Sequence, residues 1–293
     1  MKFFSIIYLT LPLIISAFDD VVRGSNLFGL ETPLKNIDCS WVKPNSYYIE
    51  KLHNLGFNYL RIPFSAQYVK EGDFTIMDQI FDNALKYNMS ILLDYHRTYS
   101  SHQGDWFETN MNDFLQTWHT IIDRYYWKDT LQAIGLYNEY QGTDGNFWNG
   151  IMRDAVVNLE NKYPKRFYFL VGGTRFSGDI HDMDLEDLPF KDRIRYEIHK
   201  YSFSGAANRQ DWDISFGKYP EKVIVGEYGW FSDHPDQVDW AKRFIDYLKE
   251  KGIRDTYFWC SVASSSDTGG IWKQDCVTLE QSKIDLLHYL WFS

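Results

Sequence analysis

The sequence predicts a (β/α)8 barrel, a closed ring of eight parallel strands surrounded by helices. Short apolar runs rich in β-branched and aromatic residues alternate with longer amphipathic stretches, a pattern typical of βα units. Eight such runs follow one another within about 270 residues, which is the usual size of this barrel. No Pro-, Gly- or Ser-rich linker interrupts residues 20–293, so a single domain is the simplest organisation.

Each predicted strand is a short apolar run that closes on polar residues. In chain order the eight strands are Gly24–Leu30, Tyr59–Pro63, Ser90–Tyr95, Gln132–Asn138, Phe167–Val171, Ile194–Ile198, Lys222–Glu227 and Thr256–Ser261. An open doubly wound sheet is the competing fold, but such a sheet commonly carries a glycine-rich phosphate loop after its first strand. The alternation therefore favours the closed barrel.

Between the strands, apolar residues recur at helical spacing. The predicted helices are Ser46–Leu55, Ile76–Tyr87, Met111–Tyr126, Phe147–Lys162, Val238–Lys251 and Leu279–Leu290. The segment Thr174–Pro189, after the fifth strand, is predicted to be a loop. The region after the sixth strand is only weakly helical in pattern.

The first 17 residues predict a secretory signal peptide. Lys2 precedes an apolar run of about a dozen residues that ends at the small residue Ala17. That run is short for a membrane span, and Asp19 and Asp20 follow it, so we expect no stable membrane anchor. The expected mature protein is a secreted, monomeric barrel of residues 18–293.

Composition excludes some partners and limits the number of disulfides. With 30 Lys and Arg against 40 Asp and Glu, and no block of basic residues, the chain offers no surface for a nucleic-acid backbone. Three cysteines are too few for a disulfide scaffold. Cys39 and Cys276 would follow the first and eighth strands, which are neighbours in a closed barrel. We therefore predict a bridge between these two and none to Cys260.

Polar residues terminate the apolar runs, and in a (β/α)8 barrel the active site lies at the carboxyl ends of the strands. The candidate site residues are Arg61, His96, Asn138, Glu139, His199, Tyr201, Glu227 and Trp259. We expect these side chains to converge on one pocket.

Two carboxylates, Glu139 after the fourth strand and Glu227 after the seventh, would face each other across the barrel mouth. Glycoside hydrolysis needs such a pair, because one carboxyl must donate a proton while the other attacks in its ionised form. Arg61 would favour the charged form of Glu227, and Asn138 would orient a sugar hydroxyl. Either glutamate alone is more often an ordinary ion-pair partner; the two together favour catalysis.

Other chemistries have weaker support. His96, His102 and His199 lack the spacing of common metal sites, and no His-Glu-x-x-His motif is present, so we expect no metal. A serine hydrolase would need Gly-x-Ser-x-Gly, which is absent. No cofactor is expected.

Six segments, taken in order, carry a family resemblance. They are Leu-Gly-Phe-Asn-Tyr-Leu-Arg-Ile-Pro-Phe at 55–64, Ile-Leu-Leu-Asp-Tyr-His-Arg at 91–97, Tyr-Asn-Glu at 137–139, Ile-His-Lys-Tyr at 198–201, Val-Gly-Glu-Tyr-Gly at 225–229 and Phe-Trp at 258–259. Together they resemble glycoside hydrolase family 5. The resemblance implies a (β/α)8 fold and a retaining double displacement, with Glu139 as acid/base, Glu227 as nucleophile and the other six candidates in support.

The resemblance leaves the polysaccharide less defined. Loops at 104–107 and 267–271 are similar to the cellulase branch of the family, which favours an endo-β-1,4-glucanase acting on β-glucan. Mannanases and β-1,3-glucanases share the same eight residues, and a non-catalytic secreted carbohydrate-binding barrel is a further alternative. Tyr140 follows Asn-Glu where the family commonly has Pro, so the loop behind the acid/base differs here.

Ten of the 11 tryptophans have an expected place in the fold. Trp259 is expected to form a flat apolar floor for a sugar. Four others on loops or after strands are either sugar platforms or packing residues: Trp106, Trp148, Trp230 and Trp272. Five in or near helical patterns are expected to be buried: Trp41, Trp118, Trp127, Trp240 and Trp291.

Overall fold

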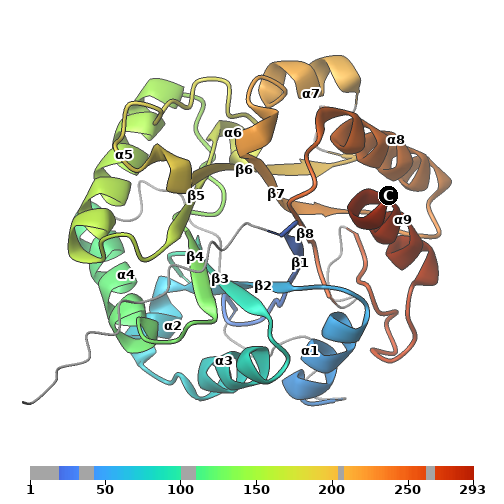
Figure 1. The fold of residues 1–293 in the computed structure, drawn as a ribbon, viewed down its shortest axis with the longest axis horizontal. Coiled ribbons are helices and arrows are strands. Elements are labelled where there is room, and N and C mark those ends of the chain that lie inside the picture. The colour runs from blue at the N-terminus through green and yellow to red at the C-terminus, as the bar shows by residue number, and fades with distance from the viewer. Residues whose placement is uncertain (1–19, 33–42, 100–109, 204–207, 262–267) are drawn as a thin grey trace, which may run out of the picture.

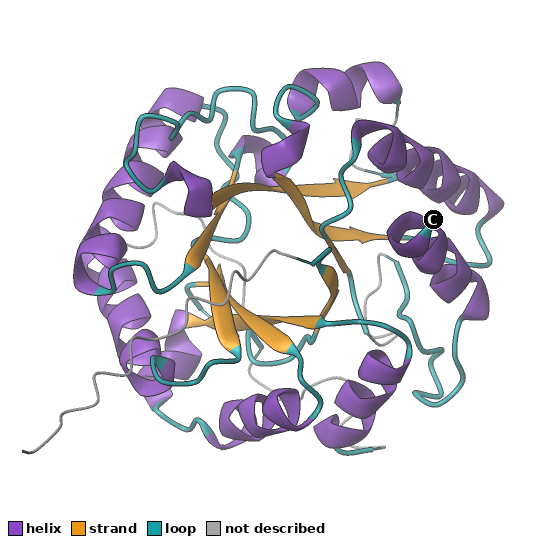
Figure 2. Ribbon diagram, viewed as in Figure 1, coloured by secondary structure: helices purple, strands orange, loops and turns teal. Residues whose placement is uncertain are grey.

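The computed structural model describes residues 20–32, 43–99, 110–203, 208–261 and 268–293. In these segments eight parallel strands form a closed barrel in the order β1 to β8, and β1 pairs with both β2 and β8. Helices surround the ring of strands (Figure 1), and Figure 2 shows the strands at the centre of the molecule. The predicted (β/α)8 fold is confirmed.

All eight predicted strands are present, with some differences at their ends. The strands are β1 (Arg23–Asn26), β2 (Tyr59–Ser65), β3 (Ser90–Arg97), β4 (Leu131–Gly135), β5 (Tyr168–Gly172), β6 (Ile194–Tyr201), β7 (Val223–Gly229) and β8 (Thr256–Phe258). The predictions for the first, fourth and eighth strands ran too far. Leu136 and Cys260 lie beyond the last residues of β4 and β8 yet are fully buried, so their apolar character reflects burial. Leu30, the predicted end of the first strand, lies beyond β1 but forms an isolated parallel bridge with Phe64.

The helices agree with the sequence pattern except where they are short. They are α1 (Asn45–Asn54), α2 (Ala66–Glu71), α3 (Thr75–Lys86), α4 (Met111–Tyr125), α5 (Gly145–Lys162), α6 (Thr174–Ser177), α7 (Arg209–Ser215), α8 (Pro235–Lys251) and α9 (Gln281–Phe292), with 3-10 turns η2 (Lys191–Arg193) and η3 (Pro220–Lys222). The sequence pattern missed α2, which has too few residues to show a helical period. Among the described residues, none of the helices has the length and apolarity to cross a membrane.

The barrel interior has an apolar floor and a polar mouth. A cluster of inward-facing residues forms the floor: Val22, Tyr59, Leu92, Ala133, Leu170, Ile224 and Tyr257. Since side chains two positions apart share one face of a strand, the next inward residues after Tyr59 and Leu92 are Arg61 and Asp94. Both are fully buried. The larger apolar core lies outside the strands, where they pack against the helices.

A bulge in β7 changes which side chains enter the mouth. Ile198 pairs with Val225, but the next residue, His199, pairs with Glu227, so Gly226 is an extra residue in the ladder. A bulge of this kind redirects the side chains around it. A Cβ atom at Gly226 would collide with the side chain of Glu197, so only glycine fits there. The bulge therefore leaves room for one buried carboxylate and directs Glu227 into the mouth.

The short α6 is a left-handed turn within the segment predicted to be a loop. Arg175, Phe176 and Ser177 have φ of 52°, 60° and 55°, and none of them is glycine. Left-handed dihedrals cost roughly 1–2 kcal/mol for each such residue. Contacts with the rest of the protein must therefore hold this turn in place.

Some sequence predictions fall outside the described residues. The predicted signal peptide at 1–17 and the loop at 104–107 are among them, as is residue 267 of the other cellulase-like loop. Cys276 takes part in a disulfide, and Cys260 is a buried free thiol. Both states agree with the predicted pairing. The predicted partner, Cys39, lies outside the described residues.

Candidate active site

A pocket of about 660 Å³ lies at the carboxyl ends of the strands. Seven of the eight predicted site residues line it: His96, Asn138, Glu139, His199, Tyr201, Glu227 and Trp259. The eighth, Arg61, is fully buried and contacts two of them. The structure therefore brings all eight side chains together.

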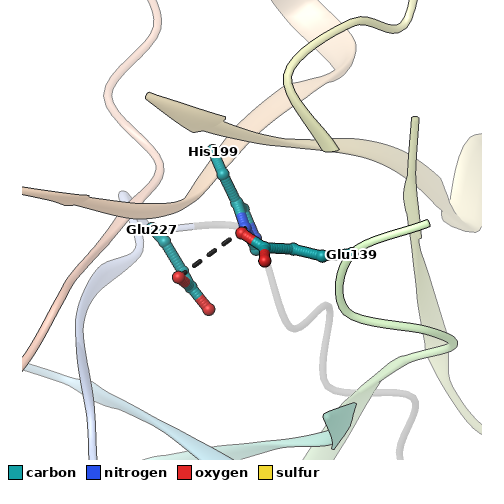
Figure 3. Close-up of side chains that lie close together, drawn as sticks. All are labelled: Glu139, His199 and Glu227. Atoms are coloured by element: carbon teal, nitrogen blue, oxygen red, sulfur yellow. Dashed lines mark hydrogen bonds and ion pairs between the residues drawn. The ribbon is translucent and has the colours of Figure 1, made fainter. Parts of the chain in front are cut away.

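Two carboxylates face each other in this pocket. Glu139 comes from the segment after β4 and Glu227 from β7, and His199 of β6 lies beside both (Figure 3). One oxygen of each carboxylate and one ring nitrogen of His199 all lie within 4.8 Å of one another. Carboxyl groups of retaining glycosidases are about 5–5.5 Å apart and those of inverting enzymes about 6.5–9.5 Å. The nearest oxygens of the pair are thus close enough for the shorter, retaining separation.

Arg61 is the cation beneath the pocket. Its guanidinium donates to Glu227 Oε1 at 2.9 Å and to Asn138 Oδ1 at 2.8 Å, and it forms ion pairs at 3.0 Å with Asp94 and with Glu197. Burial disfavours its charge, but Asp94, Glu197 and Glu227 outweigh burial and raise its pKa above the ordinary value. Arg61 is therefore a permanent positive charge that fixes the positions of its partners.

His199 lies between three carboxylates. Its Nδ1 is 2.9 Å from Glu139 Oε1 and 3.6 Å from Glu227 Oε2, and its Nε2 is 3.4 Å from Glu197 Oε1. Burial lowers the pKa of the ring, but the nearby carboxylates, Glu227 first among them, outweigh burial and raise it to about 10. His199 is thus an imidazolium at neutral pH.

The same three residues also have the spacing of a metal site. Glu139, His199 and Glu227 form a group of possible ligands in the described part of the chain. A metal ion would need a lone pair from His199. A metal ion would have to displace a proton from this ring, whose pKa is raised to about 10. The cluster is better described as a hydrogen-bonded ion network.

His96 has the opposite charge state from His199. Its Nδ1 is 2.8 Å from Asp94 Oδ2, and its ring stacks on Trp259 with centroids 5.5 Å apart. Burial is the main cause that lowers the pKa of His96 to about 3, and the positive charge of Arg61 adds to it. The ring is therefore neutral, and it supports the half-buried indole of Trp259 from one side.

Tyr201 completes the surroundings of Glu227. Its hydroxyl donates to Glu227 Oε2 at 2.8 Å, while Arg61 donates to Oε1. Burial, followed by the negative charges of Glu227 and Glu139, raises the pKa of Tyr201 well above its ordinary value, so the hydroxyl keeps its proton. Both oxygens of Glu227 are thus held by donors.

Sequence reasoning missed two buried acids of the site, Asp94 and Glu197. Each precedes a site histidine by two residues, so Asp94 shares a strand face with His96, and Glu197 with His199. The sequence does carry a signal for them. Each is a charged residue within an apolar run, two positions before the polar residue that ends the run. Burial is the main cause that raises the pKa of Asp94 to about 7, and Glu197 adds to it.

The tryptophans are mostly packing residues. Three of the four possible sugar platforms, Trp148, Trp230 and Trp272, are at most 1% exposed and cannot contact a sugar. The prediction of burial was wrong for Trp127, which is 85% exposed at the end of α4. Trp127 lies two residues beyond the last residue of α4, where the helical period no longer predicts which side chains are buried. Trp41 and Trp106 lie outside the described residues.

The titration of His199 predicts how stability depends on pH. Its pKa is about 10 in the folded chain against a usual 6.5, so folding retains a proton that the unfolded chain loses. The stabilisation is complete below pH 6.5 and is lost as the pH rises to about 10. We expect the free energy of unfolding of wild type to exceed that of His199→Gln most at pH 6, and the gap to shrink by a few kcal/mol at pH 10.

Urea unfolding at pH 6, 8 and 10 measures this gap. His119→Gln is the matched control, because burial lowers the pKa of His119 and its ring is neutral in both states well above pH 6.5. Its gap to wild type should be constant between pH 8 and 10 and slightly smaller at pH 6, which is the opposite direction from His199→Gln. A constant gap for His199→Gln as well would contradict the assigned imidazolium.

Comparison with known proteins adds the family. The family model described as Cellulase (glycosyl hydrolase family 5) matches residues 18–265. The major extracellular endoglucanase of Xanthomonas campestris pv. campestris is 23% identical over 92% of this chain and 67% of its own length. An endoglucanase of Paenibacillus polymyxa is 24% identical over 90% of this chain and 81% of its own length.

Solved structures of similar fold agree with the barrel. The endocellulase of Pyrococcus horikoshii, solved as a complex with cellotetraose, superimposes with a TM-score of 0.82 at 24% identity, covering 92% of each chain. At this identity the likeness bears on the fold. It supports the (β/α)8 barrel, at whose mouth the pocket lies.

Proposed function

The chain belongs to glycosyl hydrolase family 5, and we propose that it is a retaining endo-β-1,4-glucanase. In this proposal Glu139 is the acid/base and Glu227 is the nucleophile. One observation carries the proposal. One oxygen of each carboxylate lies within 4.8 Å of one oxygen of the other, and the two groups have different surroundings. Glu227 is nearly buried and held by Arg61 and Tyr201, whereas Glu139 has a side chain that is 17% exposed and contacts the imidazolium of His199.

In the first step Glu227 attacks the anomeric carbon of the sugar. Its two donors, Arg61 and Tyr201, hold the carboxylate in a fixed orientation for that attack. The bond from the anomeric carbon to the glycosidic oxygen breaks as the bond to Glu227 forms. Glu139 gives its proton to the departing oxygen, which leaves as a sugar hydroxyl.

In the second step water releases the sugar from Glu227. Glu139, now ionised, takes a proton from the water while the water oxygen attacks the anomeric carbon. The ester bond to Glu227 breaks and its carboxylate is restored. Two inversions give net retention of configuration. The positive charge of His199 beside both carboxylates stabilises Glu139 after it has lost its proton.

The surrounding residues suit a sugar ring. Asn138, held by Arg61 and near His96, lies next to the acid/base and is the candidate for a hydrogen bond to the 2-hydroxyl group. Trp259, backed by the parallel ring of His96, is the candidate floor. The relatives named above as endoglucanases and an endocellulase support a β-1,4-glucan as the substrate.

Release of reducing ends tests the substrate. We expect the purified protein to release them from carboxymethyl-cellulose at a higher rate than from mannan or laminarin. Glu139→Gln should remove most of that activity. A higher rate on mannan or laminarin would reassign the polysaccharide. No release from any of the three by a folded wild-type protein would contradict the hydrolase itself.

We also propose that the protein is secreted. The Xanthomonas relative is named as extracellular, and residues 1–17 predict a signal peptide. Expression of the full chain in a secreting host, followed by N-terminal sequencing of the protein in the medium, tests this. A mature chain that starts near Phe18 is expected, and retention in the cell with Met1 intact would contradict it.

A further inference from the structure

The left-handed turn of α6 lies against the segment that carries Glu139. Three donors of the turn reach carbonyls of that segment: Ser177 Oγ to Asn138 O at 2.5 Å, Phe176 N to Tyr140 O at 2.8 Å and Arg175 N to Gly142 O at 3.0 Å. The acceptors are every second carbonyl from 138 to 142. Glu139 therefore lies between two carbonyls that the turn holds.

Asn138, directly before Glu139, is held on both sides. Its backbone N–H donates to Tyr95 O of β3 at 3.0 Å, and its carbonyl accepts from the fully buried hydroxyl of Ser177. Tyr140, directly after Glu139, is nearly buried and stacks on Trp148 with ring centroids 4.3 Å apart. The backbone on both sides of the acid/base is thus fixed by contacts and not by a proline ring at position 140.

Glycine makes room for this contact. A Cβ atom at Gly172, the last residue of β5, would collide with the hydroxyl oxygen of Ser177 and would lie 3.3 Å from Asn138 O. The backbone at the end of β5 is therefore in close contact with the hydroxyl of Ser177, and no side chain fits between them. Any side chain at 172 would displace the hydroxyl from the carbonyl that it holds.

The other end of the turn is tied to β6. Lys200 Nζ donates to Gly178 O at 2.6 Å, and the Lys200 side chain is nearly buried. Lys200 stands between His199, which contacts Glu139, and Tyr201, which contacts Glu227. The turn thus connects the segment of the acid/base to the strand whose side chains contact both carboxylates.

We propose that Ser177 is a positioning residue that holds Glu139 in reach of the leaving oxygen and of the attacking water. The proposal rests on the proposed function, since it assigns Ser177 a part in the acid/base half of that reaction. Three successive residues of the turn have unfavourable left-handed dihedrals. Such a conformation persists only where surrounding contacts hold it, and residues of this kind often lie at functional sites. Here the contacts are those that fix the backbone of Glu139.

The leaving group distinguishes positioning from a general loss of structure. A sugar hydroxyl needs a proton from Glu139 to depart, whereas 2,4-dinitrophenolate departs without one. For Ser177→Ala we expect kcat/KM on cellotetraose to fall on the order of 10- to 100-fold, because misplacing a reacting group by about 1 Å has an effect of this size. On 2,4-dinitrophenyl β-cellobioside, kcat/KM should be unchanged.

The second step gives an independent readout on the activated substrate. Its kcat depends on Glu139 as the base that activates water, so we expect kcat and KM of Ser177→Ala to fall together on 2,4-dinitrophenyl β-cellobioside. Gly172→Ala, which displaces the hydroxyl without removing it, should give the same pattern. A role limited to stability would lower kcat/KM on both substrates equally.

Ser65→Ala is the matched control. Ser65 is also fully buried, and its hydroxyl caps α2 by accepting from Tyr68 N at 3.1 Å. Its loss should lower the thermal midpoint without changing the ratio of kcat/KM between the two substrates. If Ser177→Ala leaves that ratio as in wild type, the proposal is wrong although the proposed function stands. If folded wild type hydrolyses neither substrate, the proposed function fails and this proposal with it.

Discussion

Replacement of Glu227 by glutamine should lower kcat/KM on cello-oligosaccharides by about 10⁴-fold or more, because an amide cannot attack the anomeric carbon. The fold should survive the change. The glutamine carbonyl can still accept from Arg61, and its amide can donate to the hydroxyl of Tyr201. Initial rates on cellotetraose and a thermal unfolding curve measure both effects. A rate near that of wild type would remove Glu227 from the role of nucleophile.

Azide rescue of the two alanine variants separates the roles of the carboxylates. With Glu139→Ala, Glu227 still forms the glycosyl-enzyme from an activated substrate, and azide then gives a glycosyl azide of retained configuration. With Glu227→Ala, azide attacks in place of the carboxylate and gives the inverted product. The anomeric proton coupling in an NMR spectrum distinguishes the two products. The reverse outcome would exchange the two assignments.

Replacement of Arg61 by methionine should lower the free energy of unfolding by about 3–5 kcal/mol, the usual cost of removing one partner from a buried ion pair. The loss is large because Glu197 and Glu227 would lose the cation that compensates their buried charges, and Asp94, whose pKa is already raised to about 7, would take up a proton. Urea unfolding followed by circular dichroism measures it. The double variant Arg61→Met, Glu197→Gln should recover part of the loss, since one of the uncompensated charges is gone.

Arg209→Met is the control for this prediction. Arg209 pairs with Glu250 on the surface, where both side chains are at least half exposed. Exposed pairs contribute little to stability, so we expect no resolvable change. A similar loss of unfolding free energy for Arg61→Met and Arg209→Met would mean that the buried cation contributes no more to stability than an exposed one.

The sequence predicted the barrel and the pocket well because both follow from simple periods. Each strand reads as an apolar run, and the polar residue that ends the run lies at the mouth, as Glu139 and Glu227 do. The strand ends were less predictable. Leu136 and Cys260 are buried beyond the last residues of β4 and β8, and a buried residue has the same apolar signal inside a strand and just after it.

Residues that act through the backbone could not be predicted. Ser177 has no distinguishing neighbour in the sequence, and its contact with Asn138 depends on a left-handed turn that non-glycine residues rarely adopt. The direction of Glu227 likewise depends on the bulge at Gly226, which shifts the strand by one residue. Neither feature follows from hydrophobic period or residue type. Asp94 and Glu197, in contrast, were within reach of the two-residue strand period.

The partners of Arg61 also bear on how the chain folds. The guanidinium on β2 contacts Asn26 of β1, Asp94 of β3, Glu197 of β6 and Glu227 of β7. A partly folded chain that buried Arg61 before β6 and β7 had joined would hold a cation without most of its counter-charges. Such intermediates are disfavoured by the desolvation of that charge. We therefore expect the barrel to close and the pocket to assemble together, and we expect incompletely folded chains to have no hydrolytic activity.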